Sequence, residues 1–292
     1  MVNQTPQEAR LLRRRWLVWG MLAFSFLIVF FHRVGLAVVA DQLMAEFHLS
    51  AAALGNLGAV YFYIYTAMQI PSGALADTLG PRLTASMGTL VAGIGSMVFG
   101  WAPTPAVAML GRFLVGLGVS VVFISLLKIQ TEWFRPREFA TITGLTSLVG
   151  NSGNALAATP LALLVAAIGW RNSFVAVGVL GSLVAIGCWL VVRNRPADLG
   201  LSAIDELEAR EAGGRVAAAA PPPGRVALGR ALAYVGRGPY TLPLFVAAFG
   251  LNGSLMVISA MWGVPYLMQV YGLSRGQASL YTLSTAFGVM LA

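Results

Sequence analysis

The stretch "PSGALADTLGPRLT", Pro71 to Thr84, is a short turn between two long apolar runs. The runs cover roughly residues 52–72 and 83–102, and a helix of about 20 residues is long enough to cross the hydrocarbon core of a bilayer. Glycine and proline in the turn favour a reversal of the chain. The stretch therefore predicts two membrane-spanning helices joined by a tight loop that carries Asp77 and Arg82.

Composition extends this prediction to the whole chain of 292 residues. Hydrophobic residues make up 58% and charged residues 10% of the sequence, and mean hydropathy is +0.77. Soluble domains have about 25% charged residues, so this composition excludes an ordinary soluble protein. The single cysteine, Cys188, excludes an intramolecular disulfide framework. The sequence has no metal-ligand motif and no visible pairing of nucleophile and base, so we expect no cofactor, no metal and no enzyme.

Apolar runs of membrane-spanning length recur along the chain. Six of them precede a polar break, at approximately 16–40, 52–72, 83–102, 105–131, 140–168 and 172–192. A seventh covers about 241–270 and an eighth begins near Gly276. We therefore expect an all-α membrane protein with a cytoplasmic N-terminus (1–15), a six-helix bundle (16–192), a cytoplasmic linker (193–238) and the start of a second bundle (239–292).

Basic residues indicate the orientation of this bundle. If the N-terminus is cytoplasmic, fourteen of the nineteen basic residues lie on the cytoplasmic side, and only Arg171 and Arg275 lie in outer loops. This distribution follows the positive-inside rule and predicts a multi-pass protein of the plasma membrane, the inner membrane in a bacterium. The charge of +8 is spread over several loops and does not form a basic face, so nucleic acid is not an expected partner.

A weak internal repeat supports the expectation of a second bundle. Leu49 and Ser50, before the second run, match Leu273 and Ser274, before the eighth, at an offset of 224 residues. We interpret the chain as a first bundle followed by the beginning of its repeat.

Two motifs resemble those of the major facilitator superfamily. The loop matches the family's G-x-x-x-D-R-x-G-R-R signature at Gly73, Asp77, Gly80 and Arg82, although Thr78 and Pro81 depart from it. "GRFLVGLGVS", residues 111–120, is similar to the family's fourth-helix pattern R-x-x-x-G-x-G. The resemblance implies two six-helix bundles that rock about a central site, with the loop acting as a conformational switch. From the residues alone, Asp77 either caps the next helix or meets a basic partner.

Basic residues inside the apolar runs are the main candidates for substrate binding. A charge inside a membrane segment is costly, and no carboxylate lies well inside any run to pair with one. An anionic ligand would compensate these charges, and the resemblance places the first and fourth helices at the central cavity. The candidates are Arg33, Arg112 and Lys128. Snorkelling to the membrane surface is the alternative interpretation for Arg33 and Lys128.

Other polar residues could complete such a site. Tyr61, Tyr65 and Gln69 follow one another at i, i+4 and i+8, which puts them on one helical stripe that either packs or binds a ligand. His32 either carries a coupling proton or hydrogen-bonds a neighbouring carbonyl. Asn151 and Asn154 either line a polar path or form hydrogen bonds between helices. The glycines in the same runs are expected to allow close helix packing: Gly111, Gly116, Gly118, Gly150 and Gly153.

The sequence thus predicts a secondary transporter of a small organic anion, such as a carboxylate or a sugar phosphate. It would work in the lipid bilayer by alternating access, with a proton or an exchanged anion as a possible coupling ion. Two alternatives remain at this point: a proton-coupled efflux pump for drugs or metabolites, and a non-transporting membrane sensor or inert fragment.

Overall fold

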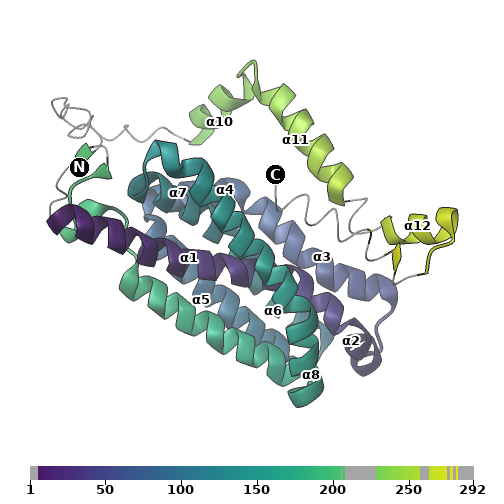
Figure 1. Cartoon of the computed structure of the whole chain (residues 1–292). Helices are drawn as coiled ribbons and strands as arrows, with labels where there is room; N and C mark the ends of the chain where they lie inside the picture. Colours follow the sequence, from purple (N-terminus) through teal and green to yellow (C-terminus); the bar gives the residue numbers. More distant parts are fainter. Residues whose placement is uncertain are drawn as a thin grey trace. The chain divides into compact units, whose positions relative to one another are not determined.

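The computed structural model describes residues 6–204, 206–207, 228–256, 263–274, 277–278 and 281, and these residues form helices and connecting loops without any strand (Figure 1). Contacts divide the chain into two units, Met1–Ala218 and Ala219–Ala292.

The helices of the first unit account for all six predicted runs. They are α1 (Pro6–Val38), α2 (Ala40–Phe47), α3 (Ala51–Ala67), α4 (Gln69–Thr78), α5 (Pro81–Gly100), α6 (Pro105–Ser120), α7 (Val122–Trp133) and α8 (Phe139–Val191), with short 3-10 turns η1 (Pro136–Glu138) and η2 (Pro196–Leu199). Among the described residues, four segments are long and apolar enough to cross a membrane: Glu8–Val38, Pro81–Gly100, Pro105–Trp133 and Pro160–Val191.

Four of the six predicted runs differ from single separate helices. The second is divided at Met68 into α3 and α4, and the fourth at Val121 into α6 and α7. The fifth and sixth join in α8, where Gly169 has a non-helical backbone (φ 78°, ψ 160°) that glycine adopts readily. Gly169 therefore marks the boundary expected between these two runs.

Glycines bring the helices into close contact, as the sequence predicted. A Cβ atom on Gly118 would lie 2.5 Å from the Ala92 backbone nitrogen, and one on Gly111 would lie 2.6 Å from that of Phe99. A Cβ on Gly116 would approach the Tyr61 carbonyl to 2.9 Å. A Cβ on Gly153 would clash with the Leu27 carbonyl oxygen of α1, whereas one on Gly150 would lie 2.7 Å from the Phe26 ring. Except at Gly150, which makes room for an aromatic side chain, these glycines let backbones meet directly, and this holds α1, α3, α5, α6 and α8 in close packing.

Two ion pairs connect α1 and α2 to opposite ends of the first part of α8, which precedes the kink at Gly169. Arg15 donates to both carboxylate oxygens of Glu138, at 2.7 and 3.2 Å. Arg171 donates to one oxygen of Glu46 from Nε at 3.0 Å and from Nη2 at 2.6 Å. Trp170 Nε1 donates to the other oxygen of Glu46 at 2.7 Å. These bonds fasten the two helical segments at both ends.

The second unit contains α10 (Leu228–Gly236), α11 (Thr241–Met256) and α12 (Gly263–Tyr271). α10 lies within the predicted linker, and most of the predicted eighth run lies outside the described residues. Ser50 accepts a hydrogen bond from the Ala53 amide at 3.2 Å, and Ser274 accepts one from the Gln277 amide at 3.4 Å. The two positions of the internal repeat thus share one local capping geometry.

Candidate functional site

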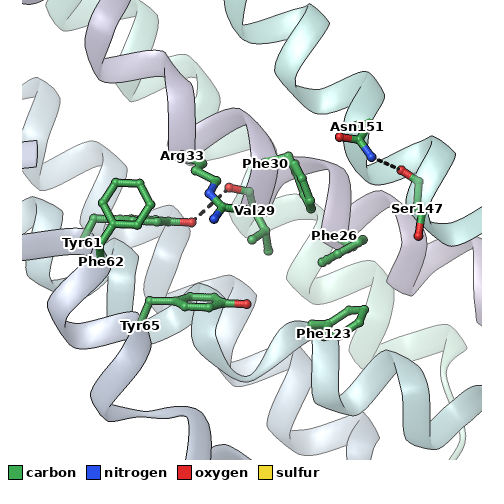
Figure 2. A pocket seen from close by; sticks show the side chains of 10 residues that line it. All are labelled: Phe26, Val29, Phe30, Arg33, Tyr61, Phe62, Tyr65, Phe123, Ser147 and Asn151. Carbon is green, nitrogen blue, oxygen red and sulfur yellow. Dashed lines mark hydrogen bonds between the residues drawn. The ribbon is translucent and has the colours of Figure 1, made fainter. Parts of the chain in front are cut away.

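A cavity of about 240 Å³ opens inside the first unit, between α1, α3, α7 and α8 (Figure 2). Aromatic rings form most of its wall, and polar groups come from three of the four helices. Its lining residues are Phe26, Val29, Phe30, Arg33, Tyr61, Phe62, Tyr65, Phe123, Ser147 and Asn151. This size suits a ligand of a few carbon atoms.

Arg33 provides the only charge among these lining residues. Its guanidinium carbon lies 5.8 Å from the ring centre of Phe30 and 5.7 Å from that of Phe62. Within the described part of the chain, this guanidinium has no hydrogen bond and no ion pair. Phe26 and Phe30 lie seven and three residues before Arg33, so α1 presents all three on one face. The guanidinium is therefore held by aromatic contacts and keeps its donors available (Figure 2).

Two tyrosines of α3 form the adjoining wall. The Tyr61 hydroxyl donates to the Val29 carbonyl at 3.3 Å, which ties α3 to α1. The ring of Tyr65 stacks on that of Tyr61, with centres 6.2 Å apart. Tyr65 keeps its hydroxyl directed toward the cavity (Figure 2). Of the predicted stripe, these two residues therefore reach the cavity.

The wall on α8 is polar as well. Asn151 donates from Nδ2 to the carbonyl of Ser147 at 2.9 Å, one turn earlier (Figure 2). This bond uses one of the two amide hydrogens of Asn151 and fixes the side chain against its helix. Ser147 and Asn151 thus supply hydroxyl and amide groups from α8, while Arg33 supplies charge from α1.

His32 and Arg112 lie behind this cavity and do not line it. Arg112 is 2% exposed, donates from Nη1 to the His32 carbonyl at 3.0 Å, and lies 4.9 Å from the ring centre of Tyr61. The sequence predicted that Arg112 binds the substrate directly. In the structure its guanidinium instead contacts Tyr61 and the α1 backbone and does not reach the cavity. Both His32 ring nitrogens are buried without a partner among the described residues, so the predicted bond from the ring to a carbonyl is absent.

Gln69 and Lys128 also lie away from the cavity. Gln69 donates from Nε2 to the Tyr65 carbonyl at 3.1 Å, across the break at Met68 that turns α4 off the α3 stripe. Lys128 pairs with Asp77 at 2.5 Å and donates to the Ala76 carbonyl at 3.1 Å. Lys128, on α7, therefore contacts the predicted switch loop.

The switch loop is held by contacts to Asn194 and Trp189, which its sequence motif did not predict. Gly80 has φ 82°, and a Cβ there would lie 2.6 Å from the Asn194 side chain. Asn194 accepts from the Arg82 amide at 2.9 Å, and Arg82 donates from Nε to the Trp189 carbonyl at 2.9 Å. No side chain caps α5, so Asp77 meets a basic partner and the capping interpretation was wrong. A Cβ on Gly73 would meet nothing within 4 Å, so packing does not require this glycine.

Sequence reasoning missed the aromatic walls of the cavity. The walls include four phenylalanines, which are apolar residues in apolar helices, so residue type alone does not mark them as cavity-lining: Phe26, Phe30, Phe62 and Phe123. Helical periodicity counted backwards from Arg33 would have identified Phe26, Val29 and Phe30. Phe123 comes from α7, and its proximity depends on helix packing that no local pattern encodes.

Comparison with known proteins is consistent with this architecture. The sequence profile of the Major Facilitator Superfamily matches residues 22–292. The chain belongs to this superfamily. It is accordingly a multi-pass membrane protein from a family of transporters and not of enzymes.

The sequence matches individual relatives over only part of their length. The chain is 30% identical over 175 residues to a probable L-galactonate transporter of Escherichia coli, covering 60% of this chain and 39% of that protein. It is 28% identical over 167 residues to a probable sulfoacetate transporter of Cupriavidus necator, covering 57% and 39%. The chain thus spans about two fifths of the length of these relatives.

A solved structure shows the same fold. This is a bacterial homologue of the human lysosomal transporter Spinster, in an inward-facing and unoccupied conformation. The TM-score is 0.63 at 22% identity, and the match covers 92% of this chain and 58% of that one. All-α superfamily architecture, predicted from the sequence, is confirmed.

Proposed function

We propose that this chain forms part of a secondary transporter that moves a small organic anion across the plasma membrane by alternating access. The observation that carries the proposal is the guanidinium of Arg33, which lines an aromatic cavity and has no carboxylate partner among the residues that the structure describes. A charge in such a place is costly unless a ligand compensates it. An anion would do so, since guanidinium binds carboxylate, sulfonate or phosphate through two parallel hydrogen bonds.

The neighbouring groups fit a small acid. The rings of Phe26, Phe30 and Phe123 can cover carbon atoms, while Tyr65 and Asn151 offer hydrogen bonds. The names of two relatives concern sulfoacetate and L-galactonate, which are both organic acids. A cationic drug would be repelled by the unpaired guanidinium, so the cavity favours an anion transporter over a cation efflux pump.

Transport would proceed by rocking of two bundles around the bound anion. Binding neutralises Arg33 and so favours the occluded state in which the cavity is closed from water. The N-terminus and the linker are proposed to be cytoplasmic, and a proton or an exchanged anion is the proposed coupling ion.

The experiment compares Arg33→Lys, Arg33→Ala and the exposed control Arg13→Ala in the full-length transporter reconstituted in proteoliposomes. Uptake of labelled L-galactonate and sulfoacetate is measured with protein amounts quantified. We expect Arg33→Lys to weaken uptake because it loses the two-donor fork, Arg33→Ala to nearly abolish it, and Arg13→Ala to leave it unchanged. Equal uptake by Arg33→Ala and the parent would refute the anion site.

A further inference from the structure

The sequence after Glu211 is basic without any acidic residue. Residues 212–292 contain five arginines, Arg215, Arg225, Arg230, Arg237 and Arg275, and no Asp, Glu or Lys. Two of these arginines, Arg230 and Arg237, lie in the described part of the second unit, and both are exposed. Neither guanidinium has a hydrogen bond or an ion pair among the described residues. Their unit offers no carboxylate, so an anion for them has to come from outside it.

Both arginines belong to a fixed bend between α10 and α11. The Val235 carbonyl accepts from the Gly238 amide at 3.0 Å and from the Thr241 hydroxyl at 2.5 Å. A Cβ on Gly238 would lie 2.8 Å from that hydroxyl, so the bend needs a glycine there. These bonds end one helix and start the next within a few residues, and the two helices do not form one continuous rod (Figure 1).

A concave site lies at this bend. It has a volume of about 680 Å³ and is bordered by Arg230, Tyr234, Arg237 and Tyr240. Arg230 and Tyr234 are spaced i and i+4, which places them on one face of α10, and Arg237 directly follows the end of that helix. The side chains of Tyr234 and Tyr240 are 84% and 76% exposed. Two guanidiniums and two phenol groups thus surround an open site that nothing in the described unit fills.

The bend stands where an apolar helix begins. α11 forms the start of the predicted seventh membrane run, and its first residue, Thr241, borders the site. If that run spans the bilayer, its first turn lies at the level of the lipid headgroups, where tyrosine is enriched. Backbone amides at the start of a helix also favour a phosphate.

We propose that this bend binds the headgroup of an anionic phospholipid of the cytoplasmic leaflet. Arg230 and Arg237 hold the phosphate, and Tyr234 and Tyr240 lie at the level of the glycerol groups. The bound lipid fixes the depth at which α11 enters the bilayer. All residues of this site belong to the second unit, and none of them lines the cavity of the first.

The test places a fluorophore at the bend in the full chain. Ala233, which borders the site, is changed to cysteine in a Cys188→Ala background, labelled, and reconstituted in phosphatidylcholine nanodiscs. Phosphatidylglycerol with a headgroup spin label is then titrated in, and the lipid fraction giving half-maximal quenching is measured. We expect Arg230→Gln and Arg237→Gln to raise that fraction about fivefold each, since one arginine near a charged surface contributes on the order of 1 kcal/mol.

Matched controls make the outcome decisive. Arg10→Gln with Arg13→Gln removes two exposed arginines elsewhere and should leave the titration unchanged. Equal quenching by spin-labelled phosphatidylcholine would overturn the proposal, as would an unchanged titration for the double variant with normal helical circular dichroism. Inorganic phosphate that alters the fluorescence in pure phosphatidylcholine discs, and blocks quenching by the anionic lipid, would identify a soluble anion instead and also overturn it.

Discussion

Arg112 on α6 donates a hydrogen bond to the backbone carbonyl of His32, the residue directly before Arg33 on α1. The same guanidinium lies against the ring of Tyr61, whose hydroxyl holds the Val29 carbonyl. The buried side chain of Arg112 thus contacts two elements that form the cavity wall, the backbone of α1 and the Tyr61 ring of α3. We infer that Arg112 sets the position from which Arg33 reaches the cavity, without itself touching the ligand.

Arg112→Met should separate positioning from stability. Replacing a buried charge by an apolar side chain of similar size is often neutral or stabilising, so we expect the melting temperature in detergent to stay level or rise. Loss of the bond to His32, worth about 1 kcal/mol, should raise the KM for the anion roughly fivefold with a smaller change in the maximal rate. An unchanged KM in reconstituted uptake would contradict the positioning role.

Asn151→Leu should change which anions are preferred. Asn151 is well placed to bond ligand hydroxyl groups, which L-galactonate has and sulfoacetate lacks. We expect competition assays to show about tenfold weaker binding of L-galactonate, the cost of roughly 1–2 kcal/mol for a lost hydrogen bond, and little change for sulfoacetate. Asn172 is the matched control, because it bonds the Ile168 carbonyl at 2.9 Å in the same way but is exposed. Equal weakening of both anions would show that Asn151 supports its helix instead.

The pair of Glu46 and Arg171 should open in acid. Burial raises the pKa of the Glu46 carboxyl, but hydrogen bonds from Arg171 and Trp170 and the charge of Arg171 outweigh it and lower the pKa below its usual value. A carboxyl with a lowered pKa stabilises the fold above its unfolded pKa, and this contribution is lost as pH falls through the folded value. Spin labels at Gln42 and Asn172, both exposed, should move apart below about pH 4.

Glu46→Gln supplies the control for that measurement. The amide cannot be ionised, so the label separation should be wide and independent of pH. A parent protein whose label separation at neutral pH equals that of Glu46→Gln would show that the ion pair does not hold α2.

Cysteine labelling tests the orientation. Arg15 is buried against Glu138 and Thr104 caps α6, so their exposed neighbours Arg13 and Pro103 are the better positions. In a Cys188→Ala background, Arg13→Cys should react with an impermeant maleimide only from the cytoplasmic side, and Pro103→Cys only from outside. The reverse pattern would refute the cytoplasmic placement of the N-terminus.

The sequence predicted those features that depend on a single helix or on the size of a single residue. Apolar length located the runs, and the absence of a Cβ explained Gly111 and Gly118. It failed where two helices have to be oriented relative to one another. Gln69 left the stripe of Tyr65 because the helix breaks at Met68, and periodicity holds only within one continuous helix. Pairing of Lys128 with Asp77 spans 51 residues and depends on how α4 packs on α7.

Two ion pairs bracket the part of α8 that lines the cavity, one at its start and one just after the kink at Gly169. Arg15 with Glu138 and Arg171 with Glu46 prevent the segment of α1 and α2 from sliding along α8 or tilting away from it. The charged wall on α1 and the polar wall on α8 are therefore tied together on both sides of the cavity. If the cavity binds an acid as proposed, this spacing would select the substrate by chain length as well as by charge.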